Sequence, residues 1–69
     1  MFPKYRIVEK TQGYHSEYYP QVRVEGFMLW RYLVMKDGVA TPVGWRHRIS
    51  YQYRFSAQNV IKLHQRQTQ

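Results

Sequence analysis

The sequence contains no cysteine, few acidic residues and no long apolar segment. Without cysteine, the chain can form neither a disulfide framework nor a thiolate zinc site. The longest apolar stretch, residues 27–35, is interrupted by Arg31, whereas a transmembrane helix needs about 20 apolar residues. Residues 1–6 also lack the apolar core of a secretion signal. We therefore expect a soluble cytoplasmic protein that has no membrane partner.

Residues suited to catalysis are scarce and scattered. No two histidines show a metal-ligand spacing such as H-x-x-x-H, and His47 is expected at the edge of the core. No two carboxylates are placed for acid–base chemistry, and the glycines stand singly, so no loop can cradle a phosphate. We therefore expect neither an enzyme nor a cofactor or metal site. The residues considered are His15, His47, His64, Glu9, Glu17, Glu25 and Asp37.

Aromatic residues and positive charge are what the chain has in excess. Its 69 residues form a single domain, which buries only about 60% of its unfolded surface. Seven Tyr, three Phe and two Trp make up 17% of the chain, and each ring can bury on the order of 150–250 Å². We expect these rings to supply much of a thin core, to which a homodimer interface would add.

The charge points to the kind of partner. Eleven Lys and Arg stand against four Asp and Glu, which gives a formal net charge of +7. Such an excess in so small a chain is typical of proteins that bind a phosphate-rich partner. An acidic protein surface is the alternative partner, and a charge that only solubilises the chain is the third interpretation.

Residues 46–55 show the clearest local pattern. Basic or polar residues alternate with mostly apolar ones over the whole segment, without Gly or Pro. Strict period two predicts a strand with one buried aromatic face and one cationic face. The apolar face would hold His47, Ile49, Tyr51, Tyr53 and Phe55, and the cationic face Arg46, Arg48, Ser50, Gln52 and Arg54.

A helix is predicted directly after this strand. Ser56 can cap its N-terminus, and apolar residues then recur at helical spacing. We expect a helix from about residue 57 to 65, with a frayed tail over residues 67–69, that folds back over the aromatic strand face. One core would then contain Tyr51, Tyr53, Phe55, Val60, Ile61 and Leu63.

Three more strands or strand candidates precede this unit. Strands are predicted over residues 4–10, 18–24 and 27–35, and a loop over residues 11–17. Pro20 cannot donate to a ladder, so the second strand should lie at an edge or begin after the proline. The third strand is nearly all apolar, which indicates a central position or an interface.

Residues 36–45 contain a predicted turn, and with them the fold class can be assigned. Asp37-Gly38 is typical of a hairpin turn with positive φ. Residues 39–45 are predicted to be a return loop or a short irregular strand. The sum is an α+β domain over residues 1–69, with a three- or four-stranded antiparallel sheet and one C-terminal helix packed on one face.

The order of these segments is similar to that of a known group of small proteins. The residues that carry the similarity are Tyr5-Arg6-Ile7-Val8-Glu9-Lys10, Tyr19-Pro20-Gln21-Val22, Leu29-Trp30-Arg31 and Phe55-Ser56 with Val60 and Leu63. In these residues the chain resembles short phage and prophage proteins, mostly of uncharacterised function, that combine a small antiparallel sheet with a closing helix. The resemblance implies a phage-type accessory protein that acts in the host cytosol, and it transfers no functional residue. His64, where an aliphatic residue is usual, and residues 36–45, a long insertion, depart from the pattern.

The predicted cationic strand face is the first candidate site. Arg46, Arg48 and Arg54 would project from one side of the strand and span about 26 Å, enough to follow several phosphates. Arg6 and Arg23 could widen the strip if the register allows. The alternative is that the face is simply solvated.

Aromatic residues outside the expected core are the second candidate site. They can stack on unpaired bases, or they can anchor a protein interface, where Tyr and Trp are enriched. The sequence leaves both uses open. These residues are Tyr14, Tyr18, Tyr19, Trp30 and Trp45.

Together these features favour a nucleic-acid-binding accessory protein that contacts DNA or RNA phosphates with little sequence specificity. The alternative is an anti-defence or host-takeover inhibitor that docks on an acidic host-protein surface, anchored by residues 27–35 with Trp30. A structural or assembly subunit is the third possibility.

Overall fold

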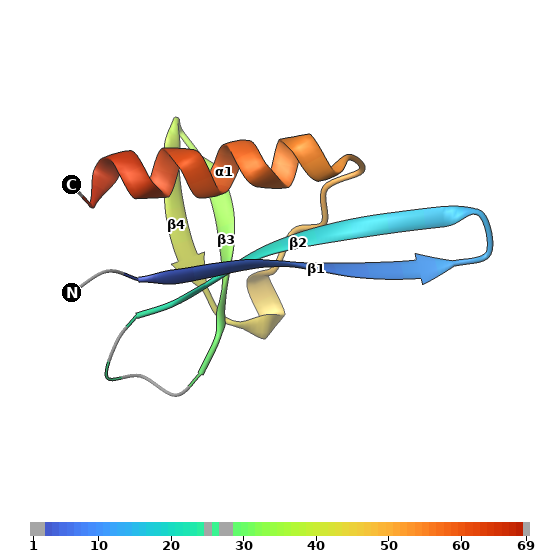
Figure 1. Ribbon diagram of the computed structural model, residues 1–69, viewed down its shortest axis with the longest axis horizontal. Helices are drawn as coiled ribbons and strands as arrows, with labels where there is room; N and C mark the ends of the chain where they lie inside the picture. Colours follow the sequence, from blue (N-terminus) through green and yellow to red (C-terminus); the bar gives the residue numbers. More distant parts are fainter. Residues whose placement is uncertain (1–2, 25, 27–28, 69) are drawn as a thin grey trace.

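A computed structural model describes residues 3–24, 26 and 29–68. Four strands form one antiparallel sheet in the order β1-β2-β3-β4, and a single α-helix follows at the C-terminal end (Figure 1). The predicted α+β class is confirmed. The elements are β1 (Lys4–Gln12), β2 (His15–Arg23), β3 (Arg31–Lys36), β4 (Val39–Val43), the 3-10 helix η1 (Trp45–His47) and α1 (Arg54–Gln67).

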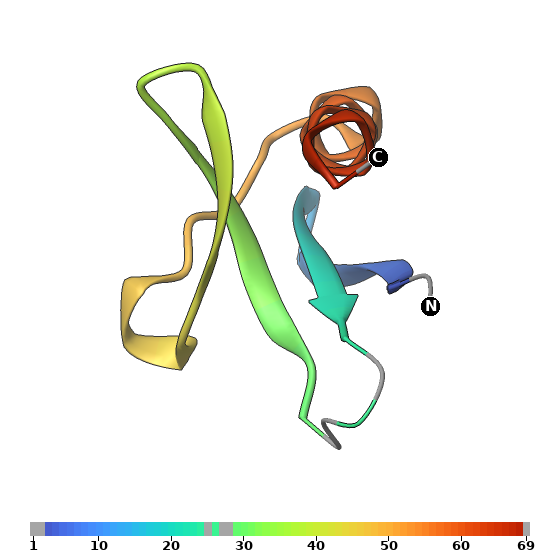
Figure 2. The same ribbon diagram turned by 90° about the vertical axis from the view of Figure 1, so that its left-hand side faces the viewer.

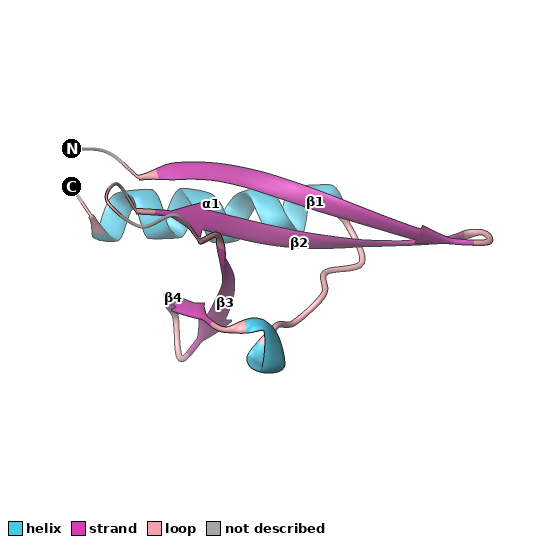
Figure 3. Cartoon of the chain, turned by 90° about the horizontal axis from the view of Figure 1, so that it is seen from below, coloured by secondary structure: helices cyan, strands magenta, loops and turns pink. Residues whose placement is uncertain are grey.

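The sheet consists of two hairpins that cross steeply. β1 and β2 pair along their whole length. β3 and β4 pair over all of β4 and most of β3. β2 and β3, in contrast, pair only at Gln21–Tyr32 and Val22–Arg31. Because this central ladder is so short, β3 turns away from β2, and the second hairpin lies across the first (Figures 1 and 3). On the Pro20 side of Gln21 the two strands share no ladder pair, and we call this break in the sheet the opening.

Tyr51 fills this opening. Its N–H donates to the Tyr18 carbonyl and its own carbonyl accepts from the Tyr18 N–H, each over 2.8 Å. On the other side, the Tyr51 hydroxyl accepts from the Met35 N–H at 3.2 Å. One residue therefore links β2 to β3 where their own ladder has ended. At this point the chain passes from η1 on one side of the sheet to α1 on the other (Figure 2).

Pro20 lies next to the same opening. The prediction that its strand is an edge strand or begins after the proline is wrong, because β2 lies inside the sheet and begins at His15. Alternate residues of a strand turn their backbone groups to the same side. Tyr18 turns its backbone N–H and C=O toward Tyr51, so the backbone nitrogen of Pro20 faces the same side of β2. No β2–β3 ladder pair exists at Pro20, so the missing N–H breaks no hydrogen bond of the sheet.

The core lies between the sheet and α1. Tyr51, Ile61 and Leu63 are partly buried and pack against a fully buried cluster, as predicted. Tyr53 and Phe55 are not core residues: they are 54% and 61% exposed and stack on each other at 5.4 Å. Their assignment to the core was wrong. The buried apolar residues on the helix side of the sheet and on α1 are Val22, Leu33, Ala40, Ala57 and Val60.

The predicted strand over residues 46–55 is also wrong. The segment begins in η1, continues as extended chain, and enters α1 at Arg54. Only Tyr51 finds a strand partner, since the neighbouring residues must carry the chain across the sheet. The helix begins earlier than predicted, with Tyr53 rather than Ser56 at the N-cap position, and it continues to Gln67.

Of the predictions for the two hairpin turns, one is confirmed and one is wrong. Asp37 and Gly38 both have positive φ, 54° and 77°, which confirms the predicted turn and the strand interpretation of the residues after it. The loop predicted over residues 11–17 is wrong, because only Gly13 and Tyr14 form the turn. This end of the first hairpin extends past α1 (Figure 1). Its residues meet water on both faces, so they lack the apolar alternation that marks a strand.

The last turn of α1 is tied to β4. The Gln67 side chain accepts from the Ala40 N–H at 2.7 Å and donates to the Ala40 carbonyl at 2.9 Å. Ala40 lies on the outermost strand of the sheet, and its backbone groups are thereby satisfied. The helix is held at this end by a side-chain amide and at its start by the Tyr51 bridge.

We expect Leu33→Ala to destabilise the protein by about 2–5 kcal/mol, because Leu33 is fully buried under α1. Phe55→Ala should lower the free energy of unfolding by at most about 1.5 kcal/mol, the scale of one aromatic stack. Urea denaturation of both variants measures this difference. An equal loss in the two variants would contradict the placement of Leu33 inside the core and of Phe55 outside it.

We expect Tyr51→Phe to lower the free energy of unfolding by about 0.5–1.5 kcal/mol, because the Met35 N–H loses its acceptor. The Met35 amide should also exchange faster with solvent, as seen by hydrogen exchange. Tyr53→Phe is the control, since it removes a hydroxyl from an exposed ring. If Met35 exchanges equally fast in the parent and in Tyr51→Phe, the hydroxyl does not hold the two strands together.

Candidate functional site

The sheet face opposite α1 gathers basic and aromatic side chains. Successive residues of a strand point to opposite faces, and the register places Arg6 beside Gln21 and Gln21 beside Tyr32. The η1 segment lies on this side of the sheet as well (Figure 2). We call this surface the open face; it comprises Lys4, Arg6, Val8, Lys10, Glu17, Tyr19, Gln21, Arg23, Trp30, Tyr32, Trp45 and Arg48.

Arginines from two neighbouring strands converge on Trp30. The guanidinium carbon of Arg6 lies 4.2 Å from the Trp30 ring centroid, and that of Arg23 lies 5.4 Å from it. The Nε of Arg6 also donates to the Gln21 side-chain oxygen at 2.6 Å, which satisfies a buried amide. Arg6 and Arg23 thus form a cluster around a tryptophan, but they widen no basic strip, because the predicted strand over residues 46–55 does not form.

Arg48 forms a second cluster with three rings. Its guanidinium carbon lies 4.2 Å from the centroid of Trp45, 5.7 Å from that of Tyr19 and 6.0 Å from that of Tyr32. Nη1 of Arg48 donates to the Trp45 carbonyl at 2.9 Å. Tyr19 and Tyr32 meet edge to face, with ring centroids 5.7 Å apart. The loop after β4 therefore brings one tryptophan and one arginine onto two strand tyrosines.

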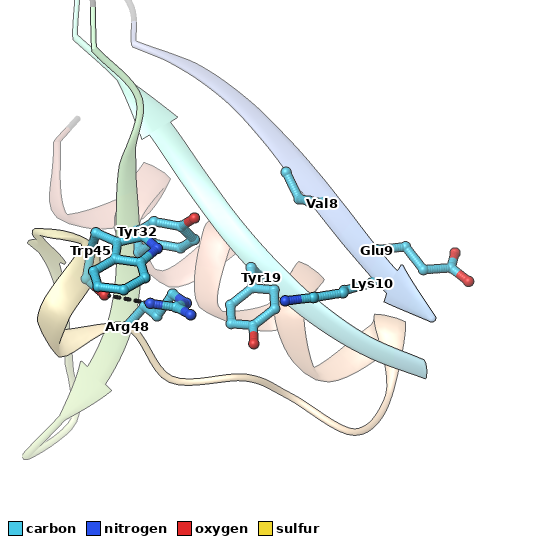
Figure 4. A pocket seen from close by; sticks show the side chains of 7 residues that line it. All are labelled: Val8, Glu9, Lys10, Tyr19, Tyr32, Trp45 and Arg48. Carbon is cyan, nitrogen blue, oxygen red and sulfur yellow. Dashed lines mark hydrogen bonds between the residues drawn. The ribbon is translucent and has the colours of Figure 1, made fainter. Parts of the chain in front are cut away.

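A pocket of about 180 Å³ opens between these rings and β1. The Lys10 ammonium points toward the Tyr19 ring, whereas the Glu9 carboxylate points away from the pocket (Figure 4). The pocket thus has aromatic walls and two cations: Lys10 close to Tyr19, and Arg48, whose guanidinium lies among the three rings. Its lining residues are Val8, Glu9, Lys10, Tyr19, Tyr32, Trp45 and Arg48.

The open face is strongly positive. Five of its side chains are cationic, and Glu17 is its one acidic member among the described residues, where it accepts a hydrogen bond from the Tyr19 hydroxyl at 3.1 Å. Within the described part of the chain the ion pair found is Arg54–Glu9, at 3.2 Å, which lies off the open face. The cations are Lys4, Arg6, Lys10, Arg23 and Arg48.

The three arginines predicted to line one strand face are separated. Arg46 is exposed in η1, and Arg54 lies at the start of α1, bound to Glu9. Of the three, only Arg48 reaches the open face. The strip of about 26 Å that the strand would have provided does not form, because the segment is not a strand.

Some of the predicted aromatic site residues lie on the open face and others do not. Tyr19, Trp30 and Trp45 join the open face. Tyr14 is fully exposed at the tip of the first hairpin, and Tyr18 faces Arg54 on the other side of β2. Neither takes part in the clusters above.

Lys4, Lys10 and Tyr32 belong to the open face and were missed from the sequence. In the strand predicted over residues 4–10, every second residue from Lys4 to Lys10 falls on the same side as Arg6, so period two followed to both strand ends would have found both lysines. Tyr32 was hidden inside an almost entirely apolar run, in which period two cannot be read.

The potential catalytic residues stay dispersed. His15 and His47 are both exposed, so the placement of His47 at the core edge is wrong. Across residues 3–24, 26 and 29–68, no three His, Asp or Glu side chains lie together as a metal ion would need. Glu25 lies outside the described residues.

His64 is a buried structural residue. It is 7% exposed, and its Nδ1 shares a hydrogen bond of 2.7 Å with the Tyr5 hydroxyl, which can donate to a neutral imidazole. Burial lowers the pKa of the His64 imidazole and raises the pKa of the Tyr5 hydroxyl. Both shifts favour the neutral pair, which fastens the start of β1 to α1.

We expect the free energy of unfolding to fall as the pH drops below about 6.5, the usual pKa of an unfolded histidine. The lowered pKa means that the unfolded chain takes up the proton of His64 more readily than the folded chain. His64→Leu should flatten the pH dependence between pH 5 and 7, and His47→Gln should not. Urea denaturation across this range measures it. A slope unchanged in His64→Leu would contradict the assignment.

No protein-family model, curated protein or solved structure matches the chain. The resemblance to phage and prophage proteins therefore stays a prediction. No helix within the described residues is long and apolar enough to cross a membrane.

Proposed function

We propose that this chain is a non-catalytic, phage-type accessory protein that binds nucleic acid through the open face with little sequence specificity. The observation that carries the proposal is the alternation of guanidinium groups and aromatic rings on the one sheet face that α1 leaves uncovered. Positive charge that follows the backbone, combined with rings on which bases stack, is the usual basis of sequence-tolerant binding.

The geometry of the arginines suits phosphate binding. The guanidinium carbons of Arg6 and Arg48 lie 4.2 Å from the ring centroids of Trp30 and Trp45. Within the described residues, Nε of Arg6 bonds Gln21 and Nη1 of Arg48 bonds Trp45, and their other N–H groups stay available to anionic oxygens. Arg can then donate to two oxygens of one phosphate at once. The rings hold the arginines in place and leave their positive charge intact, whereas a carboxylate would neutralise it.

The paired arginine offers a useful contrast. Arg54 is bound to Glu9 at 3.2 Å, so part of its charge is already compensated. Arg23 and Arg48 have no such acidic partner among the described residues. The cationic character of the open face is therefore directed to a partner outside the chain.

The second candidate function is inhibition of a host protein through an acidic surface. A small apolar pocket of about 100 Å³ at the end of β2 and β3 favours it, because Leu29 and Val24 at its rim are 78% and 45% exposed. Trp30 lies next to Leu29 in the chain, and Trp and Arg are enriched at protein interfaces. The buried Leu33 cannot contribute to such an anchor, and Phe27 and Met28 lie outside the described residues.

We expect binding to DNA to weaken linearly with salt on a log–log scale, with a slope of about −4 to −5 for five cation–phosphate contacts on duplex DNA. Arg23→Gln and Arg48→Gln should each flatten the slope by about one and weaken binding to unrelated sequences equally. Fluorescence anisotropy at several salt concentrations, with labelled duplex and single-stranded oligonucleotides, measures this.

Lys62→Gln is the matched control, because Lys62 is an exposed cation on α1, on the other side of the sheet. It removes the same charge and should leave the slope nearly unchanged. If Lys62→Gln acts like Arg48→Gln, net charge alone explains the binding. If a nuclease-treated host lysate still yields a specific protein partner and no oligonucleotide binds, the inhibitor function takes precedence.

A further inference from the structure

The aromatic pocket beside Arg48 has the shape and chemistry of a site for one flat, acceptor-rich ring. We infer that it accepts a single unpaired base, so that the protein binds single-stranded nucleic acid in preference to duplex. This inference rests on the proposed function and names the form of its ligand. The base would stack on the Arg48 guanidinium, which itself lies over Trp45, with the Tyr19 and Tyr32 rings beside it and Lys10 close to Tyr19.

The size of the pocket fits this ligand. Its volume of about 180 Å³ exceeds the cavity of about 150 Å³ that is known to hold a benzene ring. The pocket is not enclosed but open to solvent. A base can therefore enter while its sugar and phosphate remain outside.

The walls provide a stacking surface. Arg48 lies over one face of the Trp45 ring at 4.2 Å, so a base in the pocket stacks on the Arg48 guanidinium, which Trp45 supports from its other side. The edge-to-face arrangement of Tyr19 and Tyr32 presents a ring face and a ring edge side by side. Stacking on such rings is tolerant of base identity, since every base has a π face.

The polar groups at the rim select for a nucleotide rather than for an apolar side chain. Nη1 of Arg48 is bound to the Trp45 carbonyl, and the other N–H groups of its guanidinium make no hydrogen bond to the described residues, so they can donate to a ligand. Lys10 adds a second cation, while the Glu9 carboxylate points away (Figure 4) and bonds Arg54. Base carbonyls and the adjoining phosphate are the acceptors that this rim can satisfy.

A single strand can reach both clusters of the open face at once. Tyr19 and Arg23 lie four residues apart on β2, which corresponds to about 13 Å along a strand. A backbone that follows β2 for a few nucleotides can place a base in the pocket and a phosphate at Arg6 and Arg23. In a duplex the base faces are covered by their neighbours, so only the phosphate contacts remain.

The experiment compares three fluorescein-labelled ligands of equal length at low salt: a single-stranded oligothymidylate, the same backbone with abasic sites in place of every base, and a duplex. We expect the abasic strand to bind about 5- to 150-fold more weakly than the oligothymidylate, the range for one stacked base. Trp45→Ala should remove this difference, and Trp45→Phe should restore most of it.

The control variant is Phe55→Ala, which removes an exposed ring that lies outside the open face. It should keep the full preference for the oligothymidylate. Thermal unfolding of Trp45→Ala checks that loss of this exposed side chain leaves the fold intact.

The failures of the two proposals are distinguishable. If the abasic strand and the oligothymidylate bind equally well with a steep salt dependence, the base pocket is wrong and the proposed function stands. If Trp45→Ala weakens both strands equally, the stack of Trp45 and Arg48 does not bind a base, which also overturns the pocket. If none of the three ligands binds below about 100 μM, a weak affinity even for a non-specific binder, the proposed function fails.

Discussion

The backbone pairing of Tyr51 with Tyr18 is the contact on which the rest of the structure depends. The central ladder between β2 and β3 is too short to join the two hairpins firmly. Tyr51 completes the junction and fixes the place where the chain changes sides. Because of it, α1 covers the apolar face of the sheet, while Trp45 and Arg48 are left on the opposite face beside the strand tyrosines.

Local chemistry could be predicted wherever it alone decides the structure. The Asp37-Gly38 turn follows from backbone sterics, and the first strand and the helical core position Val60 follow from periodicity. The period-two pattern of residues 46–55 led to a wrong prediction, because a strand also needs a neighbouring strand with which to pair. Which residue finds one is decided by the distant Tyr18 and by the steep crossing of the hairpins. No local pattern contains that information.

The candidate site was only partly predictable for the same reason. The excess of positive charge and the list of arginines and aromatic residues follow from composition, and Arg6, Arg23 and Arg48 do reach one face. Their grouping depends on the register between strands that are far apart in sequence. It also depends on a loop whose position is set by Tyr51. The sequence therefore predicts which residues belong to the site but not how they are arranged in space.

The amide of Gln67 on Ala40 has a consequence for self-association. The free edge of an outer strand is where a second chain adds in domain swapping or fibril growth, because its backbone groups lack partners. A glutamine side chain offers the same donor and acceptor as an incoming strand, but from within the molecule. The final turn of α1 thus competes with intermolecular pairing at β4. Colloidal stability in this small, aromatic-rich protein depends partly on whether that helix end stays docked.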